Sequence, residues 1–157
     1  MRYCLFSFLC LCFSVNLMAQ TPVEKIPEFV FYRLNKSQFT KRDIQPGKKV
    51  FFVFFDSDCD HCQHAVNDIN LHFKEFNKTE IYLVTLDKPE KIKAFMNRFG
   101  PGLFNKPNVT ILQDLKNEFI VDFNPRKYPS MLLFAANGKL LMYQDEPENI
   151  YQIFKLL

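Results

Sequence analysis

A run of six apolar residues that leads into a Cys-x-x-Cys motif constrains the fold of this chain more than any other feature. The run, residues 50–55, reads Val-Phe-Phe-Val-Phe-Phe, and the motif Cys59-Asp-His-Cys62 follows shortly after it. Such a run is too short to span a membrane, and its β-branched and aromatic side chains are typical of a strand covered on both faces. The strand is therefore expected in the interior of a sheet.

An amphipathic helix is predicted to start at the motif, because apolar residues recur after it every three or four positions. Cys59 and Cys62 then lie where a turn becomes the first helical turn, and backbone N–H groups without helical partners favour the thiolate of Cys59. Cys62 lies one turn deeper, so Cys59 is the predicted nucleophile and Cys62 the resolving thiol. The apolar positions are Cys62, Ala65, Val66, Ile69, Phe73 and Phe76.

Residues 1–19 have the pattern of a secretory signal peptide. Arg2 is the only charge, residues 3–15 are mostly apolar, and Leu17-Met18-Ala19 provides a small residue at the predicted cleavage point. Cleavage would leave residues 20–157 as one domain, exported and most simply periplasmic. A leader that stays uncleaved as a membrane anchor is the alternative.

Loss of the leader changes the cysteine count. Three of the five cysteines, Cys4, Cys10 and Cys12, belong to residues 1–19, so only Cys59 and Cys62 remain. An exported chain with a single Cys-x-x-Cys pair is not a disulfide-stapled scaffold, which indicates that the pair serves reactivity. A formal net charge of +3 is too small to indicate binding to nucleic acid.

The rest of the chain alternates predicted strands and helices. Residues 29–44 suggest an N-terminal hairpin or edge strand, and Asn137-Gly138 marks a hairpin turn near the C-terminus. Asp87, followed by Pro89 and Glu90, is expected to cap a helix, and Asp145 is expected to cap the last one. The fold class is thus α/β, with a central mixed β-sheet and helices on both faces. The further strands are predicted at residues 81–86, 109–112, 131–134 and 140–143, and helices at 89–99, 115–123 and 147–157.

The motif in its context resembles the thioredoxin superfamily, and within it the exported TlpA-like and ResA-like thiol–disulfide oxidoreductases of the redoxin branch. The resemblance covers nearly all of the chain after the leader. It is carried by the Cys59/Cys62 pair between a strand and a helix, by Tyr128-Pro129-Ser130 before a later strand, and by weaker matches at Pro27-Glu28-Phe29, residues 39–44, residues 110–114 and Asn137-Gly138-Lys139.

This resemblance implies a thioredoxin-like fold and thiol–disulfide exchange. It implies that Pro129 follows a cis peptide bond beside the cysteines, so that Tyr128 and Pro129 line the groove where a substrate strand docks. The expected partners are protein disulfides and a membrane thiol–disulfide electron donor. No cofactor or metal is expected, and the chain is expected to be a monomer.

The charged neighbours of Cys59 have opposite effects on its ionisation. Asp58 and Asp60 oppose it, whereas a protonated His61 favours it. Because two acids oppose the ionisation and only one titratable imidazole favours it, a reductant of protein disulfides is expected. A disulfide-donating oxidase or isomerase is the alternative. The chain also departs from thioredoxin, since Val53 stands where thioredoxin has a buried carboxylate, and Asp58 replaces the aromatic residue before the first cysteine.

Two other classes of protein remain open. A metal-binding module could use Cys59 and Cys62 with His61 or His64, but no second Cys or His pair completes a four-ligand site. A thiol peroxidase usually has a Thr/Pro-x-x-Cys motif, whereas Asp56 occupies the corresponding position before Cys59.

Overall fold

A computed structural model describes residues 21–157, and a seven-stranded mixed sheet forms its centre. The strand order is β2-β1-β5-β4-β3-β6-β7; β3, β4 and β5 are parallel, and the remaining pairings are antiparallel. The predicted apolar strand is β3, which lies between β4 and β6 as expected of a strand buried on both faces. The strands are β1 Val30–Arg33, β2 Gln38–Thr40, β3 Lys49–Phe54, β4 Thr79–Thr85, β5 Val109–Gln113, β6 Ser130–Phe134 and β7 Leu140–Gln144.

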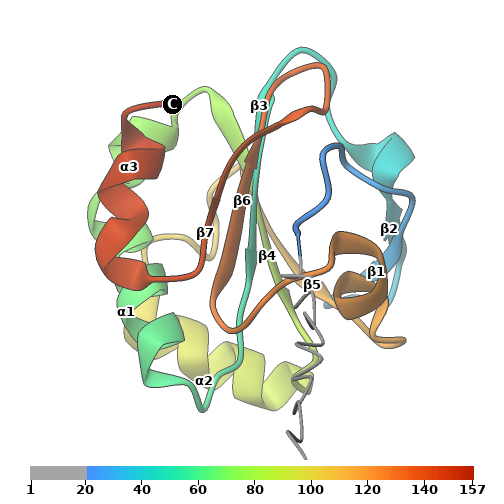
Figure 1. Cartoon of the computed structure of the whole chain (residues 1–157). Helices are drawn as coiled ribbons and strands as arrows, with labels where there is room; N and C mark the ends of the chain where they lie inside the picture. Colours follow the sequence, from blue (N-terminus) through green and yellow to red (C-terminus); the bar gives the residue numbers. More distant parts are fainter. Residues whose placement is uncertain (1–20) are drawn as a thin grey trace, which may run out of the picture.

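The α-helices of the described residues, α1 Asp60–Leu71, α2 Pro89–Phe99 and α3 Ile150–Phe154, all cover the same face of the sheet (Figure 1). Side chains alternate along β3, so Phe51, Val53 and Phe55 point to these helices. They join a core that includes Cys62, which is fully buried. The core on this face therefore fixes the helix that carries the Cys-x-x-Cys motif.

The opposite face is covered by the N-terminal segment and by one π-helical turn, Phe119–Phe123. The ring of Phe54 stacks on Phe119 at a centroid distance of 4.1 Å, and Phe119 stacks on Phe123 at 4.4 Å. The predicted α/β fold with a central mixed sheet is confirmed; of the helices expected on both faces, the α-helices lie on one face and a π-helical turn lies on the other. The helix predicted at residues 115–123, however, is reduced to this turn.

Asp114 explains why the helix is so short. Its side chain is buried, and its carboxylate accepts hydrogen bonds from the backbone N–H groups of Lys116, Glu118 and Phe119 at 3.1, 3.0 and 2.9 Å. These bonds hold the chain in a turn after β5 and direct Phe119 into the core.

Two predicted helix caps are wrong. Lys88 is the N-cap of α2, while the Asp87 carboxylate accepts hydrogen bonds from the Ser57 backbone N–H at 2.9 Å and the Thr85 hydroxyl at 3.1 Å. Asp145 pairs with Arg126 at 2.9 Å, and a 3₁₀ turn, Pro147–Asn149, precedes α3. Both carboxylates thus bind other groups and do not cap the helices that follow them.

Both predicted hairpins are confirmed. β1 pairs with β2, and β6 pairs with β7 across a turn in which Gly138 has a φ of 78°, a conformation that glycine adopts without strain. The predicted leader, residues 1–19, lies outside the described residues. Within residues 21–157, no helix is long and apolar enough to cross a bilayer.

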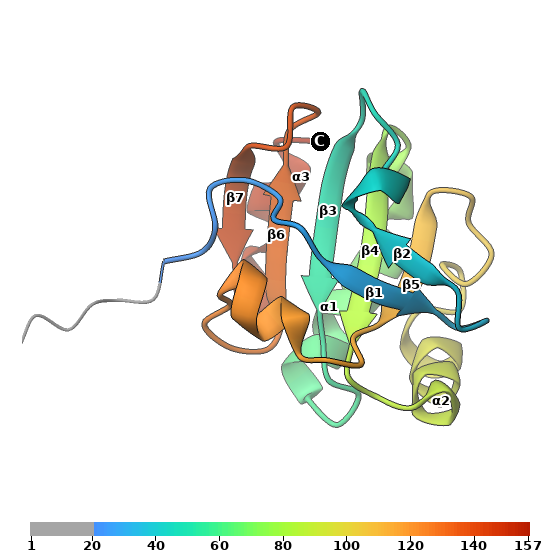
Figure 2. The same cartoon turned by 90° about the vertical axis from the view of Figure 1, so that its right-hand side faces the viewer.

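The topology brings several loops to one end of the sheet. The loops that follow the parallel strands β3, β4 and β5 meet at their carboxyl ends, at the lower end of the sheet in Figure 2. The antiparallel strand β6 starts at the same end, because Ser130 pairs with Phe54 at the end of β3. The segment around Pro129 therefore lies beside the loop that carries Cys59.

Candidate active site

Cys59 is the N-cap of α1. Its Sγ accepts a hydrogen bond from the Cys62 backbone N–H at 3.3 Å, and its carbonyl oxygen accepts bonds from the N–H groups of Cys62 and Gln63 at 3.0 and 3.1 Å. The side chain is partly exposed and its thiol is free. A hydrogen bond to sulfur at the positive end of a helix stabilises a thiolate, which is the form that attacks disulfides.

Cys62 differs from Cys59 in its burial. It is fully buried on the core face of α1, and its thiol is also free. Burial raises the pKa of the Cys62 thiol well above its ordinary value, and the hydrogen bond with Cys59 raises it further. Two thiols one helical turn apart therefore have different accessibilities, as the sequence predicted.

The loop before Cys59 is held by two carboxylates. Asp56 accepts a hydrogen bond from the Asp58 N–H at 2.8 Å, and its carbonyl accepts one from the Cys59 N–H at 3.3 Å. Asp87, two residues after the end of β4, holds the same loop through the Ser57 N–H. The sequence predicted only a capping role for Asp87, because no local sequence pattern indicates that it lies next to Ser57.

Asp58 forms an ion pair with Lys91 of α2, with 2.6 Å between the Lys91 Nζ and an Asp58 carboxylate oxygen. The hydrogen bond to Asp58 raises the pKa of Lys91. The negative charge of Asp58 beside Cys59 is thus partly balanced by Lys91, which lies 33 positions further along the chain. Asp60 and His61 are both exposed in the first turn of α1.

The Tyr128–Pro129 peptide bond is cis, as the resemblance implied. The Tyr128 ring lies 4.8 Å from the Phe54 ring, and the side chain is half-buried. Burial raises the pKa of Tyr128 to about 12, with a smaller contribution from Asp56. The phenol is therefore neutral at physiological pH, and the structure brings Tyr128 and Pro129 next to the cysteine loop.

The sequence did not predict a hydrogen-bonded network that involves Ser130, the residue after Pro129. The buried Ser130 hydroxyl donates to the Lys127 carbonyl at 2.6 Å and lies 2.7 Å from the Tyr143 hydroxyl, which accepts a bond from the Arg126 N–H at 2.9 Å. Lys127 forms an ion pair with Glu146. This network ties the segment before β6 to β7 and fixes the position of the residues beside Cys59.

Replacing Tyr143 with Phe should loosen this segment. The change removes the hydroxyl that links Ser130 and Arg126, so the free energy of unfolding should fall by about 0.5–1.5 kcal/mol. We expect urea unfolding to show this loss, while alkylation of Cys59 keeps its rate. Tyr151→Phe, at an exposed position on α3, is the matched control; equal losses in both variants would contradict the role of the network.

Val53, where thioredoxin has a carboxylate, is fully buried among apolar side chains on the α-helical face. The carboxylate of Asp56 belongs to the loop turn instead. In the described part of the chain, no group of three or more His, Cys, Asp or Glu side chains is arranged to hold a metal ion.

Comparisons with known proteins agree with this fold. The sequence profile of the AhpC/TSA family matches residues 22–142. A secreted disulfide oxidoreductase from Mycobacterium tuberculosis, homologous to E. coli DsbE, has a TM-score of 0.65 at 14% identity and covers 82% of this chain and 96% of its own. No curated protein matches the chain significantly in sequence.

Two other solved structures are similar. A thiol-disulfide oxidoreductase from Bacteroides fragilis has a TM-score of 0.65 at 17% identity and covers 85% of this chain and 99% of its own. The exposed lipoprotein thioredoxin Etrx1 from Streptococcus pneumoniae has a TM-score of 0.57 at 20% identity, with coverages of 83% and 99%. Because the family profile spans most of the chain and the sheet has the thioredoxin-like arrangement, the chain belongs to the AhpC/TSA family and is a thioredoxin-like oxidoreductase.

Proposed function

We propose that the protein is an exported thiol–disulfide oxidoreductase that reduces protein disulfides through Cys59 and Cys62. The observation that carries the proposal is the difference between the two thiols. Cys59 is partly exposed at the start of α1 with a backbone N–H directed at its sulfur, and Cys62 is buried one turn further on. This arrangement suits one attacking and one resolving thiol.

The reaction proceeds by two exchanges. The Cys59 thiolate attacks one sulfur of a substrate disulfide, forming a mixed disulfide and releasing a substrate thiolate. Cys62 then attacks Cys59 Sγ, which forms the Cys59–Cys62 disulfide and releases the second substrate thiolate. The substrate gains two electrons and the protein loses two, so an external dithiol must reduce the pair before the next cycle.

The raised pKa of Cys62 keeps the proton on its thiol in the reduced protein. Cys62 stays a neutral thiol while Cys59 is a thiolate, because a second charge in the core is disfavoured by burial and by Cys59 itself. Once the mixed disulfide has formed, the Cys62 proton passes to the leaving substrate thiolate, directly or through water. This route needs no carboxylate at Val53.

The direction of electron flow depends on charges around Cys59. Lys91 balances Asp58, and Asp60 remains as a negative charge in the first turn of α1 without an ion pair among residues 21–157. A negative charge there opposes the thiolate and destabilises the reduced pair, which makes the protein more reducing. His61 has the opposite effect when protonated, and a disulfide donor is the alternative outcome.

Export and recycling complete the proposal. Residues 1–19 would act as a cleaved signal peptide, leaving residues 20–157 as a monomeric domain outside the cytoplasm. The M. tuberculosis neighbour is described as secreted and the S. pneumoniae neighbour as an exposed lipoprotein. In such a compartment a membrane thiol–disulfide electron donor would return the pair to the dithiol form.

The function is tested by insulin reduction with residues 20–157. With a dithiol recycling agent, the protein should accelerate precipitation of the insulin chains well above the rate of the agent alone. A parallel assay of hydrogen peroxide consumption should show no comparable rate. Absence of insulin reduction would overturn the proposal, and fast peroxide turnover at Cys59 would assign the protein to the thiol peroxidases instead.

A further inference from the structure

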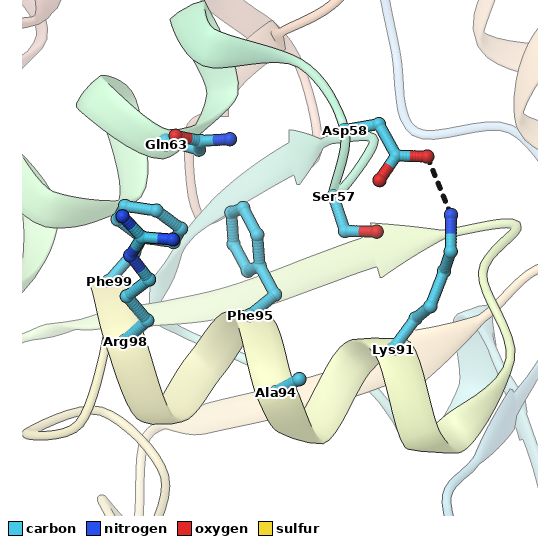
Figure 3. A pocket seen from close by; sticks show the side chains of 8 residues that line it. All are labelled: Ser57, Asp58, Gln63, Lys91, Ala94, Phe95, Arg98 and Phe99. Carbon is cyan, nitrogen blue, oxygen red and sulfur yellow. Dashed lines mark hydrogen bonds and ion pairs between the residues drawn. The ribbon is translucent and has the colours of Figure 1, made fainter.

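A cleft of about 390 Å³ lies between the loop that precedes Cys59 and helix α2. Ser57 and Asp58 form one wall, Gln63 of α1 continues it, and Lys91, Phe95 and Arg98 line the α2 side (Figure 3). Asp58 is the direct neighbour of Cys59 in the chain. The cleft is therefore placed where residues that flank a substrate cysteine could lie during exchange.

The charges in the cleft are unevenly balanced. At one end Lys91 pairs with Asp58 at 2.6 Å and also lies 4.0 Å from an Asp87 carboxylate oxygen, so this cation is not free. At the other end, the Arg98 guanidinium stacks over the Phe99 ring at 5.0 Å and has no acidic partner among residues 21–157. Among the residues that line the cleft, Arg98 is thus the cation without an acidic partner, and it favours an anionic group.

Ser57 and Phe95 shape the wall and the floor of the cleft. The Ser57 hydroxyl oxygen is buried and has no hydrogen-bond partner in the described part of the chain. Phe95 is 4% exposed and stacks on Phe55, so it forms a rigid apolar floor between the two cations. An apolar floor lowers the local dielectric constant and strengthens an ion pair formed beside it.

The spacing of Lys91 and Arg98 along α2 gives the length of the cleft from the end at Asp58. Lys91 and Arg98 are separated by seven residues of one helix, which is about 10 Å at 1.5 Å per residue. An extended peptide covers that distance in about three residues. A substrate segment that runs along the cleft from Asp58, the neighbour of Cys59, would bring a side chain about three residues further on to Arg98.

We propose that this cleft selects protein disulfides that carry an acidic side chain about three residues from the cysteine attacked by Cys59. Arg98 binds the carboxylate, and Phe95 contacts the residues between it and the cysteine. This inference rests on the proposed thiol–disulfide exchange and adds the class of substrate to it. The occupant is a segment of a disulfide-bonded protein, because the cleft begins at the residue next to Cys59 and its unpaired cation, Arg98, lies about two helical turns beyond the Lys91 that pairs with Asp58.

The test uses peptide disulfides that differ at one position. Glu, Gln or Lys is placed three residues before or after the cysteine of an otherwise identical extended peptide, and kcat/KM for reduction is measured at low and high salt. The Glu peptide should be reduced about two- to fivefold faster than the Gln peptide in at least one of the two placements, and the Lys peptide should be slowest. High salt should reduce the differences in kcat/KM between the peptides, because the charges are partly exposed to solvent.

Variants of α2 distinguish the effect of the cleft on substrate choice from the effect of general surface charge. Arg98→Gln should remove the difference between the Glu and Gln peptides, and Arg98→Glu should make the Lys peptide the best substrate. Lys93→Gln removes a cation from the same helix at an exposed position outside the cleft, and it should keep the wild-type order.

The outcomes distinguish this inference from the function on which it rests. If all three peptides are reduced at equal rates, or if Arg98→Glu keeps the wild-type order, the cleft does not select acidic substrates and the exchange function stands. If no peptide is reduced by the wild-type protein, the proposed function itself fails.

Discussion

Replacing Cys59 with Ser should abolish reduction of protein disulfides, and replacing Cys62 with Ser should stall the reaction at a mixed disulfide. The first change removes the accessible sulfur at the start of α1, and the loss should be on the order of 10³-fold or more, as for other covalent nucleophiles. The second change leaves the attack intact and removes the thiol that releases the substrate.

Non-reducing gels and mass spectrometry of the two variants check this prediction. Cys62→Ser should accumulate a covalent adduct with a substrate protein, and the adduct should map to Cys59 and disappear on reduction. Cys59→Ser is the matched control and should form no adduct, since its remaining thiol is fully buried. Adducts that form on Cys62 in the Cys59→Ser variant would reverse the assigned roles.

The two thiols should also differ strongly in alkylation. Between pH 7 and 9, iodoacetamide should modify Cys59 at least about 100-fold faster than Cys62, because the Cys62 thiol is buried and its raised pKa keeps it neutral throughout this range. In denaturant both cysteines should react at similar rates. Peptide mapping by mass spectrometry after timed quenching measures both rates in one sample.

The same pKa shift predicts a pH dependence of stability. In the unfolded chain Cys62 has an ordinary pKa of about 8.5, whereas in the folded protein the pKa is raised. The unfolded state therefore releases its proton first, so the contribution of Cys62 to stability is present below pH 8.5 and is lost as the pH rises above it. Cys62→Ala should remove this part of the dependence. Rapid alkylation of Cys62 in the folded protein at pH 7 would contradict the assignment.

Much of the fold could be predicted from local sequence patterns. The apolar run of β3 and the periodicity after Cys62 fix a strand, a turn and a helix, because their signals come from adjacent residues. The Asn137-Gly138 turn is a local signal of the same kind. The π-helical turn at Phe119 could not be predicted, since it depends on how Asp114 uses its carboxylate after β5.

The sequence predicted that the two cysteines lie at the start of a helix, but it revealed none of the contacts made with distant parts of the chain. Cys59 and Cys62 lie three positions apart in one motif, and the cis bond before Pro129 was expected only from the family resemblance. Lys91 and Tyr143 join the site through contacts across distant parts of the chain, with Asp58 and Ser130 respectively. Such pairings have no periodic signal, so a single sequence does not reveal them.

The equilibrium reduction potential of the Cys59/Cys62 pair tests the central claim most directly. Residues 20–157 would be equilibrated with glutathione mixtures, trapped by acid and scored for free thiols. A structural pair would show no reversible transition in this range, whereas a redox-active pair titrates with two electrons, and 30 mV corresponds to about 1.4 kcal/mol. Thioredoxin, at about −270 mV, and a strong oxidant, at about −120 mV, mark the two ends of the scale. We predict one two-electron transition on the reducing side of the midpoint between these values; a potential close to −120 mV, or no transition at all, would contradict a reductant that works through this pair.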